Sequence, residues 1–241
     1  MLHKTKGIVF HHIKYSDNSM VAYVYTELFG RQSYMIKGAY TKKSQVKAGL
    51  FQPLNLLQLE VYHKPNNELQ KIKEAAIDPM FTSIPFHPSK TAISIFLAEV
   101  LYRTIREEAA NEDLFNFVFH AVQVFDLMQT GFADFHLVFL IQFSKLLGFY
   151  PTNNFQPEYP VFDLLAGKFT TTEPLHGHFL ESRLGAQFSQ LLEVSFENIH
   201  DVQLTNDERR EILTGLVDYY SCHLEPMGKI KSLQVLFEVF K

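Results

Sequence analysis

The segment Met20–Lys37, MVAYVYTELFGRQSYMIK, consists of two β-rich runs separated by a turn. β-Branched and aromatic residues predominate in both runs, as is typical of strands. Gly30 lies between the runs and can supply the left-handed backbone conformation that a tight hairpin needs. The segment therefore predicts an antiparallel hairpin that joins residues 20–26 to residues 31–37.

Three further strand patterns flank this hairpin, at residues 7–13, 54–62 and 69–73. Turn-forming residues separate them, most clearly in Lys64-Pro65-Asn66-Asn67. Five short strands within about 75 residues indicate a small closed sheet. The pattern fits an OB-fold, which is a five-stranded Greek-key barrel, but also an SH3-like barrel or a plain meander.

The hydrophobic period changes from two to about 3.6 after residue 80, which predicts helices in the remainder of the chain. The apolar faces or start signals lie at residues 93–105, 115–125, 133–147, 186–196, 205–220 and 230–240. Asn111 can cap the second of these helices, the third is apolar on nearly every side, and Thr205-Asn206-Asp207-Glu208 has the pattern of a capping box. Residues 149–178 interrupt this pattern with four prolines and a short hairpin pattern around residues 161–171. We therefore expect an α+β protein with a barrel domain at 1–80 and an all-α helical bundle at 81–241, carrying an irregular insert at about 149–178.

The net charge of −4 hides an asymmetry between these two parts. Residues 1–80 contain 11 basic and 6 acidic residues, a net charge of +5, whereas residues 81–241 contain 11 basic and 20 acidic residues, a net charge of −9. The basic part can attract a polyanion that the acidic part repels. The distribution favours a nucleic-acid contact in the first domain, although small domains also differ in charge by chance.

One basic cluster occupies a strand end and the loop that follows it. Loops between strands are where small barrels contact oligonucleotides, because lysine and arginine neutralise phosphates and aromatic rings stack on unpaired bases. The alternative is an ordinary surface loop whose tyrosines pack inward. The candidate DNA-binding residues are Lys14, Arg31, Tyr34, Lys37, Tyr40, Lys42, Lys43 and Lys47.

No pattern of catalytic or metal-binding residues stands out. The chain has neither a phosphate loop nor a nucleophile elbow, and Cys222 is its single cysteine. His11 and His12 are adjacent on an expected strand, so they point to opposite faces and cannot share a metal. No run reaches the ~18 apolar residues of a membrane span. We expect a soluble, non-enzymatic protein without a cofactor or metal.

The succession of these features resembles the RecO family of recombination mediators. The matching motifs occur along the whole chain in the family's order. They are Lys14-Tyr15-Ser16-Asp17-Asn18-Ser19, Val24-Tyr25-Thr26-Glu27-Leu28-Phe29-Gly30, Tyr34-Met35-Ile36-Lys37-Gly38-Ala39, Lys42-Lys43-Ser44, Gln52-Pro53-Leu54, Leu146-Leu147-Gly148-Phe149-Tyr150-Pro151 and Gly228-Lys229-Ile230-Lys231-Ser232-Leu233.

The resemblance implies an N-terminal OB-fold and a C-terminal helical domain. It further implies a cytoplasmic, nucleoid-associated protein of DNA repair and recombination, which binds single- and double-stranded DNA, anneals complementary strands and works with RecR to load recombinase. In some members the acidic C-terminal tail of single-stranded DNA-binding protein docks on the bundle. Arg103, Arg106 and Lys145 are the candidate residues for such a contact here.

This chain departs from many RecO-like sequences in its insert. Those sequences hold zinc with four cysteines there, whereas residues 152–178 contain none. We therefore expect no stoichiometric zinc, with aromatic packing in its place by Phe155, Tyr159, Phe162 and Phe169. The rival function is a protein-interaction module with an SH3-like barrel and no nucleic-acid role.

Overall fold

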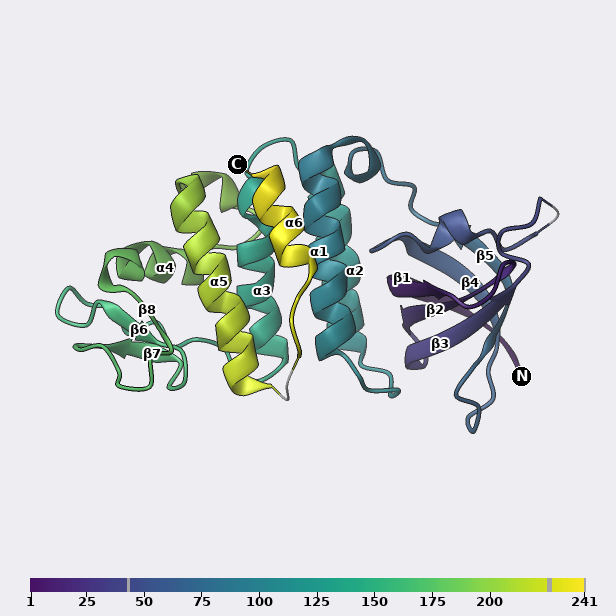
Figure 1. Cartoon of the computed structure of the whole chain (residues 1–241), viewed down its shortest axis with the longest axis horizontal. Helices are drawn as coiled ribbons and strands as arrows, with labels where there is room; N and C mark the ends of the chain where they lie inside the picture. The colour runs from purple at the N-terminus through teal and green to yellow at the C-terminus, as the bar shows by residue number, and fades with distance from the viewer. Residues whose placement is uncertain (43, 225–226, 241) are drawn as a thin grey trace. The chain divides into compact units, whose positions relative to one another are not determined.

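The computed structural model describes residues 1–42, 44–224 and 227–240. Figure 1 labels its strands and helices, which are β1 (Leu2–Lys14), β2 (Ser19–Thr26), β3 (Gly30–Lys37), β4 (Leu56–Tyr62), β5 (Lys71–Ile77), α1 (Pro88–Thr104), α2 (Glu112–Leu127), α3 (Phe135–Leu146), β6 (Val161–Asp163), β7 (Lys168–Thr170), β8 (Phe179–Leu180), α4 (Gly185–Leu192), α5 (Asn206–His223) and α6 (Ser232–Val239). Short 3-10 turns lie at Ala48–Phe51, Ile84–Phe86, Phe132–Asp134, Ser182–Leu184 and Ile199–Asp201. This order confirms the expected α+β class.

The chain divides into two compact units. The first comprises residues 1–126 with 230–233, and the second comprises residues 127–229 with 234–241. The first unit contains the five-stranded sheet together with α1 and most of α2. Its compactness thus extends past residue 80, where the sequence pattern places a domain boundary, and that boundary stays a prediction.

The five strands of the first unit form one antiparallel sheet in the order β3-β2-β1-β4-β5. The predicted hairpin is present, with Thr26 paired to Gly30 and Ser19 paired to Lys37. Gly30 has a φ of 61°, and a Cβ added to it would lie 2.4 Å from the carbonyl oxygen of Ala109. Glycine is therefore required at this turn both by the backbone conformation and by the close approach of Ala109.

The sheet curls so that its two edge strands meet at one point. A parallel bridge pairs Tyr34 of β3 with Gln70, the residue before β5. The backbone amide of Gln70 donates to the Ser33 carbonyl oxygen at 2.8 Å, and the backbone amide of Met35 donates to the backbone carbonyl oxygen of Gln70 at 3.0 Å. The apolar side chains inside the curled sheet form its core, with Val9, Val24, Tyr34, Leu57 and Val61 all fully buried. This topology is consistent with the expected OB-fold.

The second unit is built on α3, which is buried from Phe135 to Ile141 as its all-round apolar sequence predicted. Helix α5 packs beside it through two consecutive tyrosines. The Tyr220 hydroxyl donates to the Leu140 carbonyl oxygen at 2.6 Å, and the Tyr219 hydroxyl donates to the carbonyl oxygen of Phe149. Buried hydroxyls of this kind need such acceptors, so the two tyrosines fix α5 against α3.

The insert contains the hairpin that the sequence predicted, formed by β6 and β7, and β8 adds a third strand. Phe162 is the centre of its core, with ring centroids 5.0 Å from Phe169 and 4.7 Å from Phe188 of α4. Phe155 contacts Phe169 at 5.3 Å. Tyr159 is 39% exposed, so it contributes less to this core than the sequence suggested.

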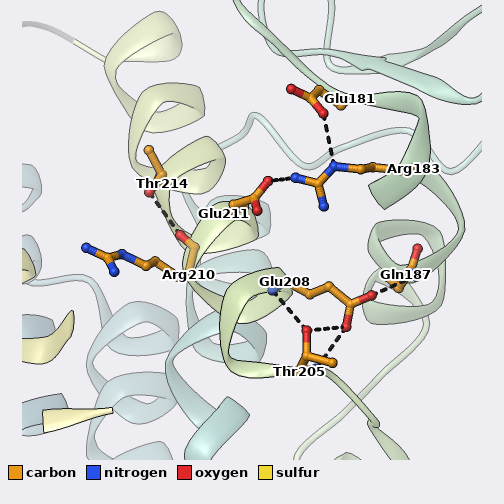
Figure 2. Close-up of polar contacts among 8 residues, drawn as sticks. All are labelled: Glu181, Arg183, Gln187, Thr205, Glu208, Arg210, Glu211 and Thr214. Atoms are coloured by element: carbon orange, nitrogen blue, oxygen red, sulfur yellow. Dashed lines mark hydrogen bonds and ion pairs between the residues drawn. The ribbon is translucent and has the colours of Figure 1, made fainter. Parts of the chain in front are cut away.

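Polar contacts join the segment after β8 to α5, as Figure 2 shows. Arg183 donates to Glu181 at 3.0 Å and forms an ion pair with Glu211 of α5. The capping box expected from the sequence begins α5, because Thr205 and Glu208 bond reciprocally to each other's backbone amides. The segment after the insert is therefore fixed to α5 by polar contacts, whereas the insert itself packs on α4 through Phe162.

Candidate nucleic-acid interface

The register of the sheet brings basic residues to one end of it. Lys14 at the end of β1 pairs with Met20, and Lys37 at the end of β3 pairs with Ser19, so both lysines lie at the end of the sheet where β2 begins. Lys42 and Lys47 follow in the loop after β3, and both are exposed. Tyr40 of the same loop is 45% exposed. These five candidates are thus accessible to a ligand.

A groove of about 470 Å³ adjoins this basic end. It lies between the last residues of β3, the loop after β3 and the start of β5, and it brings Lys37 together with Lys71 and Lys73. The sequence analysis missed the last two residues. Their signal was the alternation Lys71-Ile72-Lys73 in an edge strand, which became informative only when β5 was known to meet β3.

Acidic neighbours neutralise some of the lysines on the barrel. Glu60 forms ion pairs with Lys73 at 2.8 Å and with Lys4 at 3.4 Å, and Lys14 pairs with Asp17 at 3.6 Å. The hydrogen bond from Lys73 lowers the pKa of Glu60, against the opposing effect of desolvation. These three lysines therefore attract an anionic ligand less strongly than a lysine without an acidic neighbour.

The remaining cations of this end are not neutralised. Over the part of the chain that the structure describes, no acidic side chain forms an ion pair with Lys37, Lys42, Lys47 or Lys71. All four are exposed. A polyanion can therefore contact four ammonium groups here without first displacing a carboxylate.

Two of the expected contact residues have structural roles instead. The Arg31 guanidinium donates to the carbonyl oxygens of Tyr102 and Ile105, at 3.0 Å each, and lies 4.5 Å from the centroid of the Tyr102 ring. It thereby binds the carboxyl end of α1 to β3. Tyr34 is fully buried in the barrel core, where burial raises its pKa and where its ring cannot stack on a base. Lys43 lies outside the described residues.

The expected partner-binding residues do not form one patch within a unit. In the first unit Arg103 pairs with Glu99 at 3.2 Å, and the Arg106 Nε donates to the Arg103 carbonyl oxygen at 3.3 Å. Lys145 belongs to the second unit, where it is exposed in the last turn of α3. Each arginine thus has at least one neighbour within its own helix region.

The second unit contains a different pocket, of about 340 Å³, whose lining includes two arginines, one aspartate, Asp207, and several apolar side chains. Leu213, Leu236 and Phe240 supply apolar walls. Arg209 is held by Asp134 at 2.7 Å, whereas Arg210 lies over the Phe237 ring at 4.5 Å. In Figure 2 the Arg210 side chain points away from the Arg183–Glu211 ion pair.

This pocket was missed because α5 and α6 are separate in sequence. The adjacent arginines 209 and 210 and the aromatic residues 237 and 240 gave no sign that they would meet. The pocket combines an exposed guanidinium with apolar walls. It can therefore take a ligand that has both a negative charge and an apolar group.

Residues 1–42, 44–224 and 227–240 contain no arrangement typical of a metal site or of a membrane span. No group of three or more histidine, cysteine, aspartate or glutamate side chains is arranged there to hold a metal ion. Nor does that part of the chain contain a helix that is both long and apolar enough to cross a membrane.

Comparison with known proteins gives matches along the whole chain. A family model described as "Recombination protein O N terminal" matches residues 1–80, and one described as "Recombination protein O C terminal" matches residues 86–234. Proteins named "DNA repair protein RecO" are similar over their full lengths in Bacteroides fragilis, at 42% identity, and in Phocaeicola vulgatus, at 40% identity. The protein of that name in Flavobacterium psychrophilum is 38% identical over 98% of both chains.

Proposed function

Because the chain belongs to the RecO family of DNA repair proteins, we propose that it binds single- and double-stranded DNA through the basic end of its barrel. Family membership supports a role in DNA repair and recombination. The proposal adds that the protein anneals complementary strands and, with RecR, helps to load recombinase, and that it works in the cytoplasm at the nucleoid.

The four lysines without acidic partners carry this proposal. Lys37, Lys42, Lys47 and Lys71 present ammonium groups around one end of the barrel. Such contacts reach phosphates but no base edges, so they position DNA without selecting a sequence. Single and double strands both carry phosphates, and both can therefore bind at this end.

Annealing follows from charge screening and needs no chemical step. Two complementary strands repel each other through their phosphates, and bound lysines reduce that repulsion while leaving the bases free to pair. No bond is made or broken by the protein. We accordingly propose a mediator, not an enzyme, and assign no catalytic residue.

For protein partners, we propose that the acidic tail of single-stranded DNA-binding protein docks at the pocket beside Arg210. This pocket offers a cation next to apolar walls, whereas Arg103 and Arg106 have polar neighbours on their own segment. Lys145 remains a candidate for a contact with RecR or with this tail. Arg210→Glu should weaken binding of a synthetic copy of that tail and leave DNA binding unchanged.

The DNA proposal is tested with neutral substitutions at two of the free lysines. Lys37→Gln with Lys71→Gln removes two phosphate contacts, and Lys64→Gln removes an exposed lysine of the β4–β5 loop outside the groove as a matched control. Fluorescence anisotropy with a labelled oligothymidine at several salt concentrations measures the affinity and its salt slope. Each lost phosphate contact should reduce the magnitude of the slope of log affinity against log salt by about 0.7 for a single strand.

The outcomes separate the two candidate functions. A salt slope whose magnitude decreases by roughly 1.4 in the double variant, and stays unchanged in the control, supports the basic end of the barrel as the DNA site. An unchanged slope in the double variant places the site elsewhere. Absence of salt-dependent DNA binding by the unmodified protein would favour the protein-interaction module.

A further inference from the structure

The two edge strands of the barrel separate directly after the point at which they meet. Gln70 bonds to β3 on both sides of its peptide, through Ser33 and Met35. Beyond this bridge, no further backbone hydrogen bond joins the described residues 35–37 to residues 71–73. The sheet therefore has an open seam, and the groove described above occupies it.

The pairing of β3 with β2 shows which backbone groups face the seam. In an antiparallel pair, alternate residues direct both their amide and their carbonyl toward the partner strand or away from it. The Met35 amide bonds to Gln70, so Met35 and Lys37 belong to the set that faces away from β2. The Met35 carbonyl and the Lys37 amide consequently face the open groove.

Nearer the start of β3, two backbone groups of this edge already have partners. The Arg31 amide donates to the Glu107 carbonyl oxygen at 3.0 Å, and the Ser33 carbonyl accepts from Gln70. Exposed strand edges are templates for pairing with another chain, and proteins usually cover or charge them. The part of this edge that borders the groove is residues 35–37, and apolar Val46 and Ile72 line the groove beside it.

We propose that this groove binds an extended, acidic segment of a partner protein, which adds as a strand along Met35–Lys37. An added strand supplies both a donor for the Met35 carbonyl and an acceptor for the Lys37 amide, and its alternate side chains reach the groove wall. Acidic side chains on the segment meet Lys37 and Lys71, which have no acidic partner in the described chain.

The backbone groups favour a peptide over a DNA phosphate as the occupant of the seam itself. A phosphodiester accepts hydrogen bonds but has no donor for the Met35 carbonyl, and it gains nothing from Val46 or Ile72. Lys37 and Lys71 are common to this site and to the proposed DNA site. An acidic segment in the groove therefore competes with DNA and regulates its release.

The probe for this site is a fluorescein-labelled ten-residue peptide in which glutamate alternates with valine. Its control has the same side chains but N-methyl groups on alternate amides, which removes backbone donors without changing charge. We expect saturable binding of the first peptide by the full chain, at least tenfold weaker binding of the methylated one, and release of bound oligothymidine by the first alone.

The lysine variants supply the matched controls. Lys37→Gln with Lys71→Gln should weaken peptide binding, whereas Lys64→Gln should not. Equal binding of the two peptides would show attraction by charge alone and overturn strand addition, and so would absence of saturable binding. Oligothymidine binding measured on the same preparation separates the proposals, because DNA binding without peptide binding refutes only the strand site, and peptide binding without DNA binding refutes only the DNA site.

Discussion

Replacing Asp126 with alanine should destabilise the first unit by about 3–5 kcal/mol, the usual cost of breaking a buried charged network from one side. Asp126 is 4% exposed at the end of α2. Its carboxylate accepts from the amide and hydroxyl of Thr82 at 2.7 and 2.8 Å, and from the amides of Ser83 and Ile84 at 2.9 and 2.8 Å. The side chain thus fixes the segment that leads from the barrel into α1.

The magnitude follows from the groups that lose their partners. Three backbone amides lose a charged acceptor, and a hydrogen bond to a charged group contributes roughly 1.5–3 kcal/mol. Lys90 is 2% exposed, and its ammonium donates to the Ser83 hydroxyl and to the carbonyl oxygens of Phe125 and Asp126. Removal of the carboxylate takes away a nearby negative charge that favours this buried cation, which adds to the cost.

Urea unfolding followed by circular dichroism measures the effect, with Asp126→Asn and Lys90→Met as companions. Asp126→Asn keeps one acceptor oxygen and should cost less than Asp126→Ala. Lys90→Met combined with Asp126→Ala should cost less than the sum of the two, because Lys90→Met removes the ammonium that Asp126→Ala leaves uncompensated. A loss below about 1 kcal/mol for Asp126→Ala, or strict additivity in the double variant, would refute the argument.

Three further predictions concern pH, the insert and zinc. Burial of Asp126 opposes its ionisation, but hydrogen bonds from the amides of Thr82, Ile84 and Ser83 outweigh burial and lower the pKa of Asp126. The carboxylate therefore stabilises the fold fully above the ordinary aspartate pKa of about 3.9, and this contribution is lost as pH falls through the lower pKa of the folded state. An acid titration in which Asp126→Asn loses stability as steeply as the unmodified protein would contradict this expectation. Phe162→Ala should cost about 3–5 kcal/mol in urea unfolding, because a fully buried ring at the centre of the insert is removed, and a cost like that of an exposed site such as Leu175→Ala would exclude this packing role. Metal analysis of purified protein should find less than one zinc per chain, and a stoichiometric zinc would overturn the expectation drawn from the missing cysteines.

The local sequence was sufficient to predict structure wherever the residues of one short segment determine its conformation. The hairpin around Gly30, the capping box at Thr205 and the side-chain cap of Asn111 on the Leu114 amide were all identified from spacing and residue type. Burial of Tyr34 was also accessible in principle. Gln32, Tyr34 and Ile36 alternate with Arg31, Ser33 and Met35 along β3, and the first set is the one that faces the core.

Contacts between distant segments were beyond the reach of the sequence. The Arg31 guanidinium bonds to carbonyl oxygens 71 and 74 residues away, and nothing near Arg31 distinguishes it from a cation that awaits a phosphate. The sequence likewise did not predict that Lys71 lies near Lys37, because their proximity depends on the bridge between Tyr34 and Gln70 that joins the two edges of the sheet. Hydrophobic patterns in the sequence predict the strands and which side of each strand is buried. The position of a binding site also depends on which edge strands of the sheet meet, and these patterns do not give that information.

The distribution of carboxylates on the barrel bears directly on how DNA would be held. Glu60 lies against both Lys4 and Lys73, whereas no carboxylate of the described residues forms an ion pair with Lys37, Lys42, Lys47 or Lys71. Four contacts to a single strand correspond to a salt slope of about −2.8, which is roughly a 50-fold loss of affinity between 50 and 200 mM salt. Binding of this kind is strong enough to gather strands yet readily reversible. If the protein anneals strands as proposed, it must release the duplex it has formed, and a small set of exposed lysines would provide that release, whereas a deep and fully basic channel would retain the product.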